Sequence, residues 1–369
     1  MDVLVTDGMM KKSLAVVRTI DPLTAKTGVI SSYPTSVAGV SQYADEHHRV
    51  ARSTPKRYVS RLNRIFERET YDYLLPIGGW TTRALTEQVG VLDPAVGVVL
   101  PGSEAMATAQ SKLETARLAE RLGVPTPRTA MVTPDTDPER ILETYGTPVV
   151  VKAPTESARR FVEYADSSRK LRAAVETYRR RDGDDPLVQE YLPGEGCGFF
   201  ALYLDGRLAG HYSHTRIREY PPTGGISACA ESNRDPRLRE LGTRLLDDLG
   251  WNGPVMVEFK RDAGGTPNLV EINPKLWGSL DLAIASGLDF PSALLRYMDS
   301  GERPEFTYRE RRCHWPLSGD LQHAVSRPGS AGAVLADIVS SDTASNLSLL
   351  DPLPNVYEAG KAVLSPFID

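Results

Sequence analysis

The chain has 369 residues, a length that predicts two or three packed units, and its 41% hydrophobic and 25% charged residues are typical of a globular protein. A net charge of −5, from 43 basic and 48 acidic residues, excludes a broad basic surface for nucleic acid or an anionic membrane. Three distant cysteines, an N-terminus without a signal-peptide pattern and no apolar run of roughly 18 residues predict a cytoplasmic protein without disulfides or membrane spans.

Short apolar runs alternate with helical stretches over the first hundred residues, which predicts a parallel α/β layer. Two of these runs end in the turn residues Gly78-Gly79 and Pro101-Gly102, as buried strands commonly do. The predicted strands are residues 3–5, 28–31, 73–77 and 97–100, and the predicted helices are residues 12–20, 59–69 and 82–89.

A helical pattern over residues 103–122 stops at Gly123, with Pro125 and Pro127 just beyond it. A small α/β unit follows, and then an antiparallel section in which Asp205-Gly206 suits a two-residue hairpin turn. The predicted strands are residues 148–152, 160–164, 187–191, 198–204, 208–217, 226–230, 254–260, 268–272 and 313–316. The predicted helices are residues 138–145, 168–180, 236–249, 279–286 and 290–299.

The strongest chemical signal is a predicted hairpin that carries Glu258 on its first strand and Glu271 and Asn273 on its second. Side chains two apart on a strand share a face, and pairing the strands brings Glu258 toward the face of Glu271 and Asn273. Such converging carboxylates repel one another unless a cation lies among them, and oxygen ligands suit Mg²⁺. The alternative is an acidic hairpin edge that faces solvent.

Two lysines are candidate anion ligands. Lys152 ends a buried apolar strand, where a lysine either extends its charge to solvent or binds an anion in a cleft. Lys112 opens a helix, and a cation at a helix N-terminus opposes the helix dipole and favours a nearby anion. Neither lysine by itself shows whether an anion site is present.

Two further segments are ambiguous when taken singly. The strand of residues 187–191 breaks at Pro193-Gly194, which either exposes backbone groups to a ligand such as adenine or is a plain strand end. Arg216 and Arg218 alternate onto one face of a strand that leads into a glycine pair. Two guanidinium groups on one face match a carboxylate or phosphate, although a solvated edge strand has the same pattern.

In this order, the motifs resemble the ATP-grasp superfamily, and most closely its stand-alone ligases related to carbamoyl phosphate synthetase and biotin carboxylase. The resemblance covers residues 111–291, and its most specific part is Glu271-Ile272-Asn273-Pro274 with Glu258 upstream. The supporting motifs are Ser111-Lys112, Gly123-Val124-Pro125-Thr126-Pro127, Val150-Val151-Lys152, Gln189-Glu190-Tyr191, Trp277-Gly278-Ser279 and Gly287-Leu288-Asp289-Phe290-Pro291.

The resemblance implies an α/β fold in which a Rossmann-like N-terminal domain precedes an ATP-grasp fold of two lobes. The expected parts are the N-terminal domain (residues 1–105), a small α+β lid lobe with its linker helix (106–190), a larger antiparallel-sheet lobe with the Mg-ATP site (191–300) and a C-terminal extension packed on the core (301–369).

The resemblance also implies a carboxylate–amine or carboxylate–thiol ligase that forms an acyl phosphate from ATP and a small carboxylate, releasing ADP and phosphate. Small-molecule carboxylates and amines would be its partners, with a homodimer as a further expectation. The resemblance also assigns residue roles by position. Lys112 and Lys152 would bind the ATP phosphates, and the rest of the nucleotide would contact Gln189, Glu190, Tyr191, Leu192 and Glu195. One or two Mg²⁺ ions, with Mn²⁺ as an alternative, would be bound by Glu258, Glu271 and Asn273, the phosphoryl group or substrate carboxylate by Lys275, and the acceptor side would be formed by Arg216 and Arg218.

One segment departs from the family pattern. The loop that covers the phosphates is usually rich in glycine, whereas residues 154–160 contain none, so backbone N–H groups approach phosphate less closely. Two alternatives are open: Arg159 or Arg160 substitutes for those contacts, or the loop becomes ordered only when a ligand binds. The departure favours one rival, an ATP-binding module without catalysis. A second rival, independent of the loop, is an ATP-grasp kinase that releases a phosphorylated product.

Overall fold

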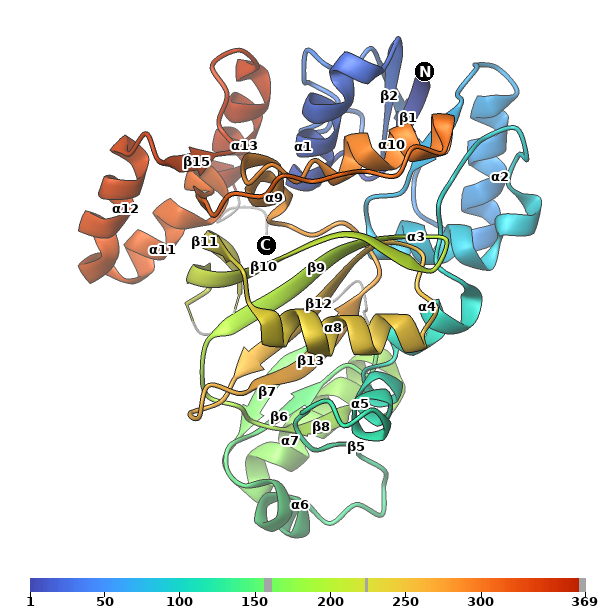
Figure 1. The fold of residues 1–369 in the computed structure, drawn as a ribbon. Coiled ribbons are helices and arrows are strands. Elements are labelled where there is room, and N and C mark those ends of the chain that lie inside the picture. Colours follow the sequence, from blue (N-terminus) through green and yellow to red (C-terminus); the bar gives the residue numbers. More distant parts are fainter. Residues whose placement is uncertain (156–160, 223–224, 365–369) are drawn as a thin grey trace.

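The computed structural model describes residues 1–155, 161–222 and 225–364, and three β-sheets organise them (Figure 1). A parallel sheet lies at the N-terminal end, a seven-stranded mixed sheet lies at the centre, and an antiparallel sheet lies at the far end of the molecule. This arrangement confirms the α/β fold class that the sequence predicted. The exact domain boundaries given above remain predictions.

The N-terminal sheet has the strand order β3-β2-β1-β4, and every pairing in it is parallel. The predicted strand at residues 97–100 forms only an isolated bridge between Gly97 and Tyr73. The strands are β1 (Asp2–Val5), β2 (Lys26–Ser31), β3 (Glu46–Arg49) and β4 (Tyr73–Leu75), and the helices are α1 (Lys11–Ile20), α2 (Pro55–Phe66) and α3 (Gly79–Glu87).

The helical stretch predicted over residues 103–122 is two helices, α4 (Ser103–Gln110) and α5 (Lys112–Arg121), which meet at Ser111. Ser111 is extended, and its hydroxyl accepts a hydrogen bond from the backbone N–H of Glu114, which caps α5. Ser111 also forms a bridge with Thr155, and the Lys112 N–H donates to the Pro154 carbonyl at 2.9 Å. The break therefore holds Lys112 beside the chain that leaves β6.

The antiparallel sheet at the bottom of Figure 1 has the order β5-β8-β6-β7 and forms a small lobe with its own core. Its strands are β5 (Thr129–Met131), β6 (Val149–Lys152), β7 (Val162–Ala165) and β8 (Leu187–Glu190), with helices α6 (Pro138–Tyr145) and α7 (Ser168–Asp182). Most of the glycine-free loop, including Arg159 and Arg160, lies outside the described residues.

The central sheet has the order β13-β12-β9-β10-β11-β14-β15. Asp205 and Gly206 join β9 to β10 with φ of 50° and 69°, the positive values that the predicted hairpin turn requires. All residues of β9 are buried because both faces of the sheet are covered, so Phe199 and Phe200 enter different cores. The strands are β9 (Gly196–Leu204), β10 (Arg207–Tyr220), β11 (Ile226–Asn233), β12 (Gly253–Arg261), β13 (Pro267–Asn273), β14 (Arg312–His314) and β15 (Thr343–Ser345).

Helices on both sides of the central sheet connect it to the rest of the molecule. Helix α8 (Pro236–Asp248) packs on one face with α4 and α5, whereas α9 (Leu280–Ala285) and α10 (Phe290–Ser300) join the other face to α1 of the N-terminal domain. The C-terminal extension adds β14 and β15 to the sheet edge and the helices α11 (Leu321–Ser326), α12 (Ala331–Val339) and α13 (Pro352–Leu364).

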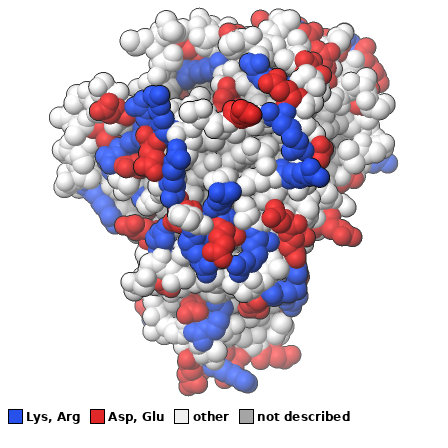
Figure 2. Space-filling model, viewed as in Figure 1, with Lys and Arg blue, Asp and Glu red and all other residues white. Residues whose placement is uncertain are grey.

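The surface shows no broad region of one charge on the face in Figure 2, where basic and acidic side chains are interspersed. This agrees with the near balance of 43 basic and 48 acidic residues in the sequence. In the described part of the chain, no helix is long and apolar enough to cross a membrane.

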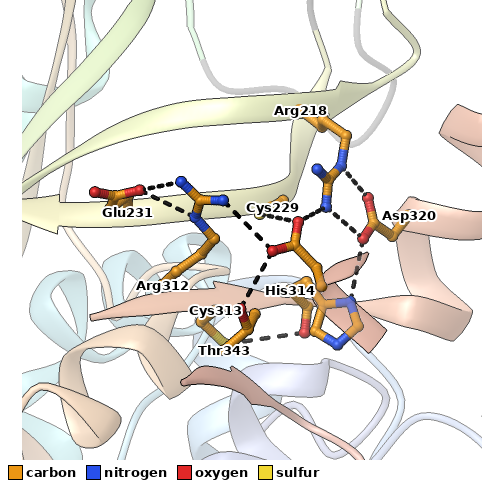
Figure 3. Close-up of polar contacts among 9 residues, drawn as sticks. Arg218, Cys229, Glu231, Arg312, Cys313, His314, Asp320 and Thr343 are labelled. Carbon is orange, nitrogen blue, oxygen red and sulfur yellow. Dashed lines mark hydrogen bonds and ion pairs between the residues drawn. The ribbon is translucent and has the colours of Figure 1, made fainter. Parts of the chain in front are cut away.

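A buried ionic network fixes the C-terminal extension to the sheet (Figure 3). The Arg218 guanidinium on β10 contacts both oxygens of Asp320, at 2.6 and 2.8 Å, and reaches Asp337 on α12 at 2.6 Å. His314 on β14 lies 3.1 Å from Asp320. Burial alone would raise the pKa of Asp320, but the hydrogen bonds from His314 and Arg218 bring it below its ordinary value. The network therefore holds ionised groups in the interior.

The network corrects the prediction that Arg218 shares a face with Arg216. Arg216 pairs with Ala230 and Arg218 pairs with the adjacent Cys229, so β10 carries an extra residue, a β-bulge, between them. The bulge places the two guanidinium groups in different surroundings, and Arg218 lies among the acidic residues of the C-terminal extension. Arg218 is therefore a structural residue, and its assignment to the acceptor side was wrong.

We predict that Arg218→Leu destabilises the fold by about 3–5 kcal/mol, because it removes the guanidinium that pairs with both buried carboxylates and leaves Asp320 with His314 alone and Asp337 with the more distant Arg312. Equilibrium unfolding in urea measures the change. Arg121→Leu is the matched control, since Arg121 pairs with Asp248 on the surface and its removal should change stability little. Equal effects of the two substitutions would show that the buried network does not hold the extension.

Candidate active site

A cavity of about 990 Å³ lies between the small lobe and the central sheet. Residues of β6 and β8 line one side, and residues of β10, β12 and β13 line the other. The volume is at the upper end of the range for small-molecule sites, enough for a nucleotide together with a second ligand. The cavity is therefore the candidate active site.

The acidic hairpin has the geometry that the sequence predicted. Glu258 on β12 pairs directly with Glu271 on β13, and Met256 pairs with Asn273, so the two carboxylates and the amide share one face. All three polar side chains line the cavity, and the Asn273 amide donates to Glu271 at 3.0 Å. A bulge at Val270 turns that residue toward the cavity as well, although simple alternation had placed it on the opposite face.

Cations from other elements neutralise this acidic face. Arg216 on β10 contacts Glu258 at 2.7 Å, and the Lys112 ammonium lies 3.7 Å from Glu271. Burial alone would raise the pKa of Glu271, but Lys112, the Asn273 amide and further lysines lower it below its ordinary value. Glu271 is therefore ionised at neutral pH. The groups on this face that can coordinate a metal ion are all oxygen atoms, from the two carboxylates and the Asn273 amide.

This donor set fits Mg²⁺, which prefers carboxylate and other oxygen ligands and completes its shell with water or substrate phosphates. Glu258, Glu271 and Asn273 would hold such an ion. Two paired carboxylates in one cavity wall are also a place where a divalent cation relieves like-charge repulsion.

Lys152, at the end of β6, reaches into the same cavity from the small lobe. Its ammonium donates to the Gln189 side-chain oxygen at 2.7 Å, and the Gln189 amide nitrogen donates to Thr129 at 2.9 Å. Burial lowers the pKa of Lys152 to about 8, and the negative charge of Glu271 opposes this shift. Gln189 thus orients Lys152, because both ends of its side chain are already bonded.

Three other predicted nucleotide residues, Glu190, Tyr191 and Leu192, line the cavity at the end of β8. Glu190 pairs with Arg128 at 3.0 Å, and the Leu192 carbonyl accepts a hydrogen bond from Lys260 at 2.9 Å. The Lys260 ammonium also lies 5.4 Å from the centre of the Tyr191 ring.

The other predicted residues divide between the cavity and its surroundings. Lys275 and Arg216 line the cavity, whereas Glu195 is exposed and is absent from the lining of the described cavity. Its neighbours Gly194 and Gly196 both line the wall, and successive side chains of an extended segment point in opposite directions. Glu195 therefore lacks the placement expected of a nucleotide ligand.

Four charged residues of the cavity wall were not predicted from the sequence: Lys260, Glu219, Lys11 and Arg327. Lys260 was accessible to sequence reasoning, because it stands two residues after Glu258 and so shares its face. Glu219 contacts Arg216 at 3.2 Å, next to the bulge that sequence alone did not reveal. Lys11 enters from the N-terminal domain, and only long-range packing places it there.

Comparison with known proteins agrees with this geometry. The family described as "ATP-grasp in the biosynthetic pathway with Ter operon" matches residues 182–314, which contain the acidic hairpin. A D-alanine–D-alanine ligase from Ectopseudomonas mendocina is 28% identical over 228 residues, which cover 56% of this chain and 70% of the ligase.

Solved structures share the fold over most of the chain. The biotin carboxylase domain dimer of 2-oxoglutarate carboxylase from Hydrogenobacter thermophilus, in complex with MgADP, ADP and bicarbonate, has a TM-score of 0.65 at 18% identity, covering 83% of this chain and 71% of that one. An L-amino acid ligase from Bacillus licheniformis has a TM-score of 0.64 at 15% identity, covering 85% and 79%. The chain is thus similar to ATP-grasp proteins, with the family match covering residues 182–314. These similarities agree with the resemblance to the ATP-grasp superfamily seen in the sequence.

We predict that Lys152 titrates with a midpoint near pH 8 in the free protein. NMR titration of lysine labelled at Cε measures this, with Lys152→Met to assign the resonance. Glu271→Gln removes a negative charge that favours the ammonium, so it should lower the midpoint further. A midpoint near the ordinary lysine value, or an upward shift in Glu271→Gln, would contradict the electrostatic account.

Proposed function

We propose that this protein is an ADP-forming ATP-grasp ligase that joins a small carboxylate to a nucleophile, most simply an amine, through an acyl phosphate. The observation that carries the proposal is the shared cavity face of Glu258, Glu271 and Asn273, with Lys112 and Lys152 beside it. The D-alanine–D-alanine ligase and the L-amino acid ligase named above support it as relatives of this chain.

ATP would lie across the cavity with its phosphates between the lobes. The ammonium groups of Lys112 and Lys152 would bind the phosphates, and the end of β8, from Glu190 to Leu192, would contact the adenine. Mg²⁺ bound by Glu258, Glu271 and Asn273 would neutralise phosphate charge and polarise the transferred group. MgADP in the Hydrogenobacter carboxylase domain supports the choice of ion. The use of one or two ions, and of Mn²⁺ in place of Mg²⁺, is part of the proposal.

The first chemical step is phosphoryl transfer. A substrate carboxylate oxygen attacks the γ-phosphorus, the bond from that phosphorus to the β,γ-bridging oxygen breaks, and ADP leaves. Lys275 and Arg216 line the cavity, where their charges would orient the carboxylate and stabilise the negative charge on the transferred oxygens.

The second step forms the new bond. An amine lone pair attacks the acyl carbon, the C–N bond forms, the bond from carbon to the phosphate oxygen breaks, and inorganic phosphate leaves as the amine loses a proton. Closing the cavity to water protects the acyl phosphate from hydrolysis. A cytoplasmic location, where ATP is abundant, belongs to the same proposal.

The decisive experiment measures Mg²⁺-dependent ADP release by the purified protein across pairs of small carboxylates and amines. Hydroxylamine in place of the amine converts an acyl phosphate to a hydroxamate, which identifies the intermediate. We expect one or more pairs to stimulate ADP release, and hydroxamate to form with the same carboxylates. A stable phosphoester in place of hydroxamate would indicate a kinase, and ATP binding without turnover on any pair would indicate a binding module.

We predict that Glu271→Gln lowers kcat by on the order of 100-fold or more, since even residues that only support metal ligands cost 10- to 100-fold when changed. Glu176→Gln, on the exposed side of α7, is the matched control and should retain wild-type activity. Near-normal turnover by Glu271→Gln would remove this residue from the metal site.

A further inference from the structure

The C-terminal extension carries an unusual share of the apolar side chains that face solvent. More than half of the large hydrophobic residues that are exposed in the described part of the chain come from this one segment, which is about a tenth of the sequence. Single exposed apolar residues are normal, whereas a concentration of them is typical of an interaction site. The residues that we call the apolar surface are Leu321, Val325, Leu335, Ile338, Val339, Leu347, Leu349, Leu350, Leu353 and Val356.

Helix α12, at the left edge of the molecule in Figure 1, shows the anomaly most clearly. Its sequence, AGAVLADIV, has one charged residue, Asp337, and that carboxylate is buried in the ionic network of the extension. Val334 is the other buried residue of the helix, whereas Leu335, Ile338 and Val339 are 61%, 45% and 75% exposed. A helix that is apolar on all sides is normally buried. α12 therefore has the composition of a buried helix at an exposed position.

The apolar surface is held in place at two points by buried carboxylates. Asp337 on α12 pairs with Arg218 of the central sheet at 2.6 Å. Asp351, directly before α13, pairs with Arg18 of α1 at 2.8 Å and accepts a hydrogen bond from the Ser41 hydroxyl at 2.7 Å. These contacts fix the extension to two different parts of the molecule. The surface is therefore preformed, which lowers the entropy cost of binding a partner.

Charged groups are nearly absent from the same stretch. Residues 328–357 contain three charged residues, Asp337, Asp342 and Asp351, although a quarter of the whole chain is charged. Because Asp337 and Asp351 are buried in ion pairs, Asp342 is the one charged side chain exposed in this stretch, all of which the structure describes. Depletion of charge at an exposed apolar area is the compositional mark of a protein interface.

The size of the apolar surface fits a second copy of this chain. At their exposed fractions, its side chains present an area on the order of 1,000 Å², above the roughly 300–600 Å² of the largest apolar patch on a typical monomer and close to the roughly 800 Å² that each partner gives to a standard interface. Interfaces between identical chains are also the more apolar class.

The charge of the surface points to the same partner. Two copies of a chain with a net charge of −5 repel each other, and a surface with one exposed charge lets them meet where that repulsion is weakest. In a two-fold dimer the same surface serves both copies, so it must be compatible with itself. An apolar, nearly neutral surface meets that condition.

A lipid membrane fits the surface less well. Helices that lie in a membrane interface carry Lys or Arg beside their apolar face, together with aromatic side chains. The apolar surface consists of Leu, Val and Ile, and residues 328–357 contain no Lys or Arg.

We propose that the apolar surface is the contact of a homodimer, in which α12 of each copy packs against the C-terminal extension of the other across a two-fold axis. This gives the homodimer expected from the sequence a specific surface. The contact also reaches the cavity through α11, since Leu321 and Val325 belong to the surface, while His323 Nδ1 lies 2.6 Å from the Glu219 carbonyl oxygen and Arg327 lines the cavity.

The test measures the mass of the full chain by sedimentation equilibrium over a range of protein concentrations. We expect the wild type to form a dimer of two 40.5 kDa chains. Leu335→Glu and Val339→Glu each place a carboxylate in the contact on both copies, so each should raise the Kd of the dimer by about 100-fold or more, as loss of an interface hot spot does. Both positions are exposed, and glutamate is a good helix former, so the fold should tolerate either change.

A matched control and a second measurement separate assembly from folding. Val89→Glu adds the same charge at a residue of the N-terminal domain that is 55% exposed and lies outside the apolar surface, so it should remain dimeric. Circular dichroism should be the same for all variants. In the wild type, the amide hydrogens of residues 331–339 should exchange more slowly at high protein concentration than at low concentration.

Three results would overturn the proposal. The first is a wild-type chain that stays monomeric at every concentration, and binding of that monomer to vesicles of phosphatidylcholine and phosphatidylglycerol would assign the surface to a membrane instead. The second is a dimer that survives both Leu335→Glu and Val339→Glu, which would place the contact elsewhere. The third is a dimer that Val89→Glu disrupts to the same extent, which would show that added charge acts without regard to position.

Discussion

The site depends on two carboxylates that face each other directly across one hairpin. Glu258 and Glu271 are cross-strand neighbours, an arrangement in which like charges destabilise a sheet unless other groups compensate. The compensation comes from distant parts of the chain, Arg216 on β10 and Lys112 at the start of α5. The hairpin therefore needs the linker helix and the neighbouring strand in place before its charges are balanced.

This requirement explains several local features. The break at Ser111 places the N-terminus of α5, and with it Lys112, against the chain that leaves β6. Lys152 approaches the same face from the small lobe, steadied by Gln189. Lys112 and Lys152, which help to balance the charge of Glu271, are also the lysines proposed to hold phosphates. Nucleotide binding would thus exchange ion pairs within the protein for contacts with the ligand, which keeps the net cost of desolvating these charges low.

The features of the fold and the site that could be predicted from the sequence were those determined by residues close together in the chain. The acidic hairpin and the Asp205-Gly206 turn follow from alternation and turn chemistry, which a short window contains, and both were predicted. Arg218 was misplaced because one extra residue in β10 reverses the alternation, and composition does not mark that bulge. Lys11 was missed because its place in the cavity depends on how α1 packs against residues more than 260 positions away, such as Leu276.

The ionic network around Arg218 also has a consequence for the order in which the protein can form during synthesis. Arg218 lies on β10, but the carboxylates that balance its charge, Asp320 and Asp337, follow more than 100 residues later. While the ribosome is still making the second half of the chain, that part of the sheet holds a cation without its partners, which opposes burial. The edge of the central sheet is therefore completed only when nearly the whole chain has emerged, and a nascent chain that stops near Gly301 lacks the charges needed to close it.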